Sequence, residues 1–138
     1  MNRTIIILIF FATSILAQNS RLDSLINLGI HQLYSIEFEK AELTFETIKK
    51  DYPKHPSGKF FEAMVVWWRI LLDLRVEIYD DILRDKLELV IEHCDDILDE
   101  DEKNVDAIFF KGGALGYRGR LSSLRGDWFD AAADGKDA

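Results

Sequence analysis

Residues 22–55 read LDSLINLGIHQLYSIEFEKAELTFETIKKDYPKH, and this stretch decides the fold. Apolar side chains recur in it at steps of three and four residues, which is the period of an α-helix with one buried face. The pattern ends at Pro53, because proline cannot continue a helix. We therefore expect two helices joined by a short turn, spanning about residues 20–51. The two apolar stripes are Leu22, Leu25, Ile26, Gly29 and Leu33, followed by Phe38, Ala41, Phe45 and Ile48.

The chain beyond this stretch continues as helices with apolar faces. Residues 59–74 are apolar nearly all round, which is typical of a helix buried on several sides. A turn is expected near residues 78–80, with an Asp as the N-cap of a helix over about 81–98. A helix over about 105–124, a turn at Gly126 and a last helix from Trp128 follow. The sequence thus predicts an all-α chain with further helix pairs over about 58–98 and 105–138, the last one incomplete.

Six residues of the first stretch resemble the signature of the tetratricopeptide repeat (TPR), a unit of 34 residues that folds as two antiparallel helices. The matching residues are Leu28, Gly29, Phe38, Ala41, Phe45 and Pro53. Successive spacings from Gly29 to Ala41, to Phe45 and to Pro53 are 12, 4 and 8 residues, as in that family. We interpret residues 22–55 as one complete repeat of this type.

A weaker match to the same family lies near the end of the chain, where Trp128 and Ala131 follow Gly126. The resemblance implies that residues 18–138 form antiparallel helix pairs stacked as a right-handed solenoid. It also implies a non-catalytic scaffold that binds a protein or peptide in a groove lined by the first helix of each pair. Two alternatives remain open: a small-ligand or lipid carrier with an apolar pocket, and the N-terminal helical module of a longer exported protein.

Three basic residues share one face of the helix expected over 105–124, because Lys111, Arg118 and Arg125 are seven residues apart. By resemblance to the repeat family, they are candidate groove residues that would hold a carboxylate of an acidic partner. The alternative is pairing with acids on neighbouring helices, such as those around Asp95. Aromatic side chains are further groove candidates, with core packing as the alternative for the tryptophans. These residues are Tyr117, Trp67 and Trp68.

The same helix carries residues with little or no side chain at steps of four and three, namely Gly112, Gly116, Gly119, Ser123 and Gly126. Each glycine costs up to ~1 kcal/mol relative to alanine in a helix interior. Close approach of another helix would compensate this cost, so we expect a helix packed on the strip. A phosphate-binding loop is the alternative, but Arg118 stands where the second glycine of that motif belongs.

The 138-residue chain carries 17 Lys and Arg against 25 Asp and Glu, a net charge of −8, which argues against a general nucleic-acid-binding surface. Cys94 is the single cysteine, so the chain cannot form an internal disulfide. Its position on an apolar stripe favours a buried thiol over an intermolecular disulfide. His31, His55 and His93 have no spacing typical of a metal site, and no catalytic arrangement is recognisable. The sequence therefore predicts no metal, no cofactor and no enzymatic activity.

Residues 1–17 have the pattern of a secretory signal peptide. Arg3 supplies a positive start, an apolar run begins at Ile5, and Ala17 is the expected cleavage position. The alternative is a retained membrane anchor, but the apolar stretch over residues 5–17 falls short of the ~20 residues that span a bilayer. We therefore expect export to the periplasm, the cell surface or the extracellular space.

Overall fold

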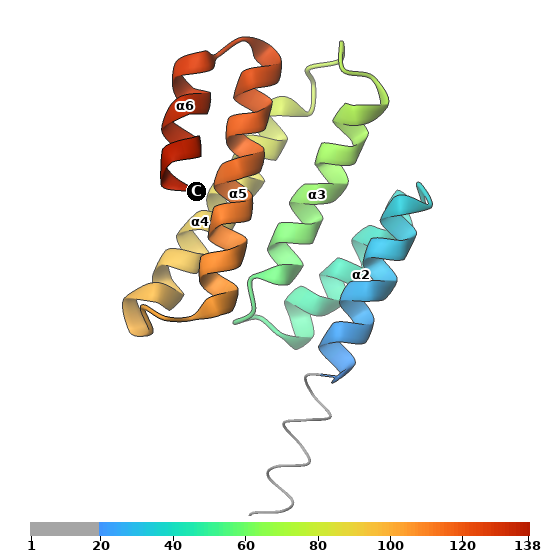
Figure 1. Cartoon of the computed structure of the whole chain (residues 1–138). Helices are drawn as coiled ribbons and strands as arrows, with labels where there is room; N and C mark the ends of the chain where they lie inside the picture. Colours follow the sequence, from blue (N-terminus) through green and yellow to red (C-terminus); the bar gives the residue numbers. More distant parts are fainter. Residues whose placement is uncertain (1–19) are drawn as a thin grey trace, which may run out of the picture.

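The computed structural model describes residues 20–138, and every regular element in that range is a helix. A helical segment over residues 20–34 comes first, whereas residues 1–19, which contain the expected signal peptide, lie outside the described part. The next helices are α2 (Phe38–Asp51), α3 (Ser57–Leu72), α4 (Asp80–Glu100), α5 (Val105–Arg125) and α6 (Trp128–Asp137). From α2 to α6, each helix packs against the next one, and successive helices run in opposite directions (Figure 1). The prediction of an all-α chain is confirmed for this range.

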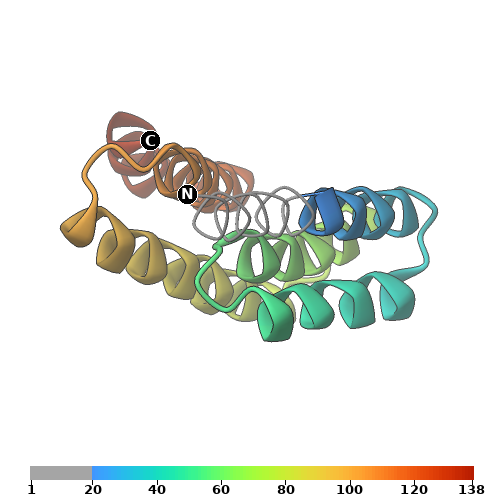
Figure 2. The ribbon, with the colours of Figure 1, turned by 90° about the horizontal axis from the view of Figure 1, so that it is seen from below.

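Helix α3 lies in the middle of the molecule and packs against α2, α4 and α5. Segment 20–34 and α5 lie on one side of it, and α2 and α4 lie on the other (Figure 2). This position explains why α3 is apolar nearly all round, since a helix with neighbours on several sides has little polar surface to present. Its buried apolar residues are Phe60, Ala63, Met64, Val65, Val66, Trp67 and Ile70.

The first two helices pack through the residues that carry the repeat signature. Ala41 and Phe45 are fully buried, and the Phe45 ring lies against the backbone of Gly29. The same ring stacks on Phe61 of α3 at 5.3 Å between centroids. Leu28 and Pro53, in contrast, are exposed. The absence of a side chain at Gly29 is therefore what allows segment 20–34 to approach α2 this closely.

The connection between α3 and α4 differs from the expectation. Helix α3 ends at Leu72, and the loop over 73–79 is longer than the turn expected near 78–80. Tyr79 is the N-cap residue of α4 and makes no side-chain capping bond, and Asp80 is the first helical residue. The carboxylate of Asp80 is nearly buried because it binds Arg125 instead of capping its own helix. A long-range partner has therefore replaced the local cap.

Cys94 is fully buried in α4, which confirms the expectation of a buried thiol. Burial raises the pKa of the thiol to about 11, and the neighbouring Asp95 acts in the same direction. The thiolate is the reactive form of cysteine, so this side chain stays protonated and inert near neutral pH. Among the helices of residues 20–138, none is both long enough and apolar enough to cross a bilayer.

Candidate functional site

An apolar groove of about 630 Å³ runs between segment 20–34, α3 and α5. These three elements lie at alternate positions along the chain, so the groove is built from the first helix of each expected pair. None of the described side chains that line it is charged. From segment 20–34 the lining residues are Ile30, Leu33 and Tyr34; from α3 they are Phe60, Phe61, Met64 and Trp68; from α5 they are Ile108, Phe109, Gly112, Gly113 and Tyr117. Ala138, which follows α6, also borders the groove.

Aromatic rings form much of the groove surface. Phe60 lies 5.2 Å from Phe110 and 6.1 Å from Tyr117 between ring centroids, in tilted and edge-on arrangements that aromatic pairs prefer. Gly113 permits this packing, because a Cβ there would lie 3.0 Å from the Phe60 ring. Phe109 remains 68% exposed although it borders the groove. The groove therefore presents apolar area that is still in contact with water.

The three aromatic groove candidates have different positions. Tyr117 and Trp68 line the groove, and Trp68 makes an edge contact with Tyr34 at 5.0 Å. Trp67 is only 4% exposed and packs against Tyr117 at 5.5 Å, so it belongs to the core. Phe109, which borders the groove on α5, was not among the groove residues expected from the sequence. Its exposure depends on how α5 is rotated against its neighbours, and an isolated helical pattern does not reveal that rotation.

The basic stripe faces α4 and not the groove. Lys111 pairs with Asp95 at 2.5 Å, and Arg118 pairs with Glu88 of α4 and also with Asp134 of α6. Arg125 pairs with Asp80 at 2.5 Å. The α4 acids recur at intervals close to the seven-residue spacing of the bases, so the antiparallel helices match one to one. These three residues are therefore not groove residues, and the alternative of pairing with neighbouring acids describes them.

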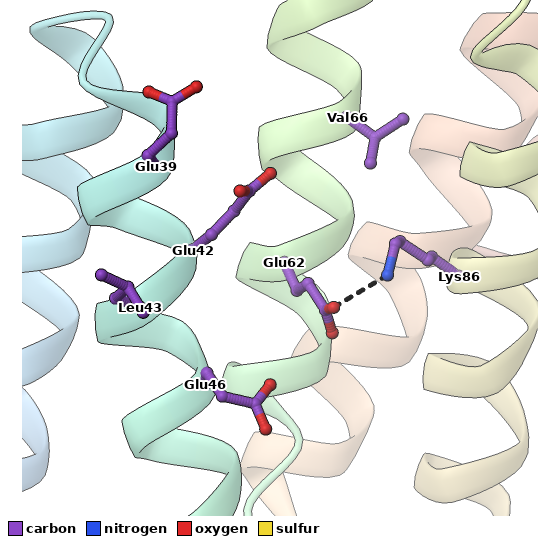
Figure 3. Close-up of a pocket in the computed structure, with 7 residues that line it drawn as sticks. All are labelled: Glu39, Glu42, Leu43, Glu46, Glu62, Val66 and Lys86. Atoms are coloured by element: carbon purple, nitrogen blue, oxygen red, sulfur yellow. Dashed lines mark hydrogen bonds and ion pairs between the residues drawn. The ribbon is translucent and has the colours of Figure 1, made fainter.

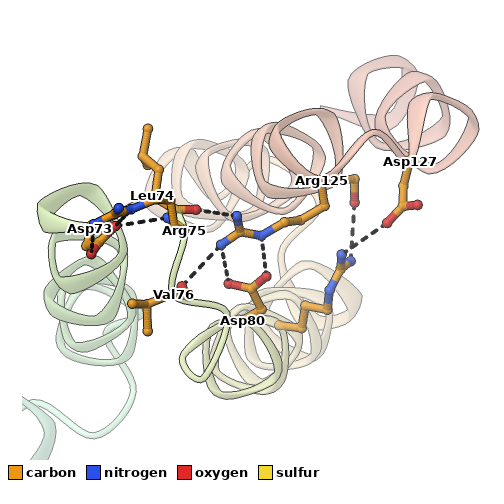
Figure 4. A network of polar contacts seen from close by, with 9 residues as sticks. Asp73, Leu74, Arg75, Val76, Asp80, Arg125 and Asp127 are labelled. Atoms are coloured by element: carbon orange, nitrogen blue, oxygen red, sulfur yellow. Dashed lines mark hydrogen bonds and ion pairs between the residues drawn. The ribbon is translucent and has the colours of Figure 1, made fainter.

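Arg125 has the most extensive set of contacts in this ladder (Figure 4). Its guanidinium donates two hydrogen bonds to Asp80, at 2.5 and 2.9 Å, and a third to the carbonyl of Leu74 at 2.6 Å. A longer contact of 3.4 Å reaches the carbonyl of Val76. The hydrogen bonds to Asp80 hold the pKa of Arg125 above its ordinary value. This side chain therefore ties the α3–α4 loop to the end of α5.

The glycine strip of α5 serves several purposes, so the expectation of one packed helix is only partly correct. A Cβ at Gly119 would lie 3.1 Å from Asp134 and 3.3 Å from the Ala131 carbonyl, which shows a close approach of α6. Gly116 faces open space, and a Cβ at Gly112 would meet only the carbonyl of the last residue. Gly126 has φ 88° and ends the helix in the left-handed conformation. Trp128, the residue of the weaker repeat match that follows this turn, is mostly exposed.

A second hollow, of about 490 Å³, lies over α2, α3 and α4 and is rich in glutamates (Figure 3). Burial alone would raise the pKa of Glu62, but hydrogen bonds from Lys49 and Lys86, both at 2.8 Å, lower it overall. Glu42 pairs with Arg69 at 3.0 Å. This hollow is therefore an ion-pair network whose charges are largely compensated.

Within residues 20–138, no group of three or more His, Cys, Asp or Glu side chains is arranged to hold a metal ion. No protein-family model, no curated protein and no solved structure matches the chain.

Proposed function

We propose that the protein is a TPR-type binding scaffold whose groove holds an apolar segment of a protein partner. The observation that carries this proposal is the uncharged groove between segment 20–34, α3 and α5, in a chain where 30% of residues are charged. A contiguous exposed apolar surface is typical of interaction sites. A groove formed by helices can accept the apolar face of a peptide through a few anchoring side chains.

We also propose that the helix pairs stack as a right-handed solenoid. The order of the elements supports it, since α3 and α5 are each followed by an antiparallel partner, as segment 20–34 is by α2. The packing of Phe45 on Gly29 also supports it, because these two residues stand in the register of the repeat signature. In such a stack the first helices share one side, where the groove lies.

Substitution of Phe109 by alanine should weaken partner binding about tenfold or more. The reason is that burying a phenylalanine side chain at an interface contributes ~1.5–3 kcal/mol. The measurement is fluorescence anisotropy with peptides that are first selected on the purified protein from a displayed library of random sequences. Stability should change little, because the Phe109 side chain is mostly exposed before binding.

Phe129→Ala is the matched control, since Phe129 is also an exposed phenylalanine, at 94%, but does not line the groove. Its affinity for the selected peptides should stay within about twofold of the wild type. Equal losses in the two variants, or no loss in Phe109→Ala, would refute the groove as the binding site.

A carrier of a small apolar ligand is the second candidate, favoured by the groove volume of about 630 Å³, which is within the ordinary range for small-molecule sites. A dansyl-labelled fatty acid distinguishes the two functions. If the protein is a carrier, the fatty acid binds tightly and the Phe109→Ala substitution weakens its binding, while the binding of no selected peptide depends on Phe109. For a scaffold, the selected peptides bind in a Phe109-dependent manner and displace any weakly held fatty acid.

Export is part of the proposal and rests on the pattern of residues 1–17. The protein recovered from the periplasm or medium of an expressing bacterium should begin at Gln18, as N-terminal sequencing would show. Recovery of the intact N-terminus in the membrane fraction would favour the retained anchor instead.

A further inference from the structure

Arg120 on α5 differs from the other arginines of residues 20–138, because it has no carboxylate partner in that range. Its guanidinium instead lies over an aromatic ring, with the guanidinium carbon 5.5 Å from the centroid of Trp67. An exposed arginine without a partner is notable in a chain with more acids than bases. The other arginines all form ion pairs, and they are Arg21, Arg69, Arg75, Arg84, Arg118 and Arg125.

Arg120 lies on the groove face of α5. It follows Phe109, Gly113 and Gly116 by 11, 7 and 4 residues, which are helical spacings that place all four on one face. It also follows the groove residue Tyr117 by three residues, and Trp67 contacts both Tyr117 and Arg120. The guanidinium is therefore located about one turn beyond the uncharged lining.

The contact with Trp67 prepares this side chain for an anion. A guanidinium held over an indole ring is restrained in position by the cation–π interaction, while its N–H groups point outward in the plane of the group. Those N–H groups match the two oxygens of a carboxylate. None of the side chains that line the groove carries a charge that would compete for such an anion.

We propose that the groove selects a partner segment that places apolar side chains on its aromatic surface and an acidic side chain about one turn beyond them, paired with Arg120. This inference rests on the proposed function and adds the charge of the partner to it. The argument is charge complementarity, because the groove itself is uncharged and Arg120 is the cation without a partner beside it.

The test is selection of a random displayed 12-residue library on the wild type, on Arg120→Glu and on Arg21→Glu. Arg21 is the matched control. It lies at the start of segment 20–34, pairs with Asp51 of α2 and does not line the groove. Only clones whose binding is lost on Phe109→Ala are counted. Clones from the wild type and from Arg21→Glu should carry Asp or Glu next to apolar residues, and clones from Arg120→Glu should carry Lys or Arg there.

A charge-neutral comparison then measures the pairing itself. Replacement of the acidic residue of a selected peptide by its amide should weaken binding to the wild type about fivefold and should leave binding to Arg120→Gln unchanged. An equal effect of the amide on both proteins would overturn the inference, as would groove-dependent clones without an acidic preference. In those cases the binding scaffold would still stand, whereas a selection that yields no Phe109-dependent clones would count against both proposals.

Discussion

The Gly29→Ala variant should lose about 2–3 kcal/mol of unfolding free energy, although alanine is the better helix former. A Cβ at this position would lie 2.3 Å from Cε1 of Phe45, well inside the contact distance of two carbon atoms. The ring has little room to move away, because it is fully buried and also stacks on Phe61. Segment 20–34 would have to shift off α2, and apolar contacts on both helices would be lost.

Gly116→Ala is the matched control for this prediction. Gly116 also lies inside a helix, but a Cβ there meets no atom within 4 Å. This variant should therefore be more stable than the wild type by up to about 1 kcal/mol, which is the helix-propensity gain alone. Urea unfolding followed by circular dichroism measures both variants. Similar stabilities for the two would show that Gly29 is not a point of close helix approach.

Arg125→Met should destabilise the protein by about 2–4 kcal/mol. Methionine keeps much of the length and apolar area of the arginine, so the main loss is the charge. The side chain of Asp80 is only 12% exposed and would keep a nearly buried carboxylate without its partner. The carbonyl of Leu74 would lose its donor as well, which releases the α3–α4 loop.

Two further variants separate this cause from a general effect of losing an arginine. Arg75→Met removes a solvent-exposed ion pair with Asp73, so the urea midpoint should hardly change. Adding Asp80→Leu to Arg125→Met should recover much of the lost stability, because the uncompensated carboxylate is gone. If Arg125→Met unfolds at the wild-type urea concentration, the Arg125 contacts do not stabilise the fold.

The helices and their apolar faces could be predicted from the sequence with good agreement. The stripe through Ala41 and Phe45, the all-round apolar α3 and the turn at Gly126 depend on local periodicity and on local backbone preferences. The start of α4 was predicted to within about a residue, but its cap was not, because Asp80 was expected to cap the helix and is instead held by Arg125, 45 residues away. A capping pattern read along the chain cannot anticipate such a distant partner.

The candidate site shows the same limit. On α5, the face with Lys111 and Arg118 and the face with Phe109 and Arg120 were both available to a groove as far as the sequence is concerned. The spacing of these residues shows only that Lys111 and Arg118 share one face of the helix and that Phe109 and Arg120 share another. Because the acids of α4 recur at almost the same interval, the first face pairs with α4 and the second remains open.

The sequence by itself therefore determined the helical class, the helix positions and the residues that share each face. These properties arise from interactions over one or two turns, which the order of residues specifies directly. Only the tertiary structure decided which face of α5 meets α4, which tryptophan is buried and where an arginine is left without a partner. Those outcomes depend on the rotation and axial register of one helix against another, and the contacts that fix them join residues far apart in the chain.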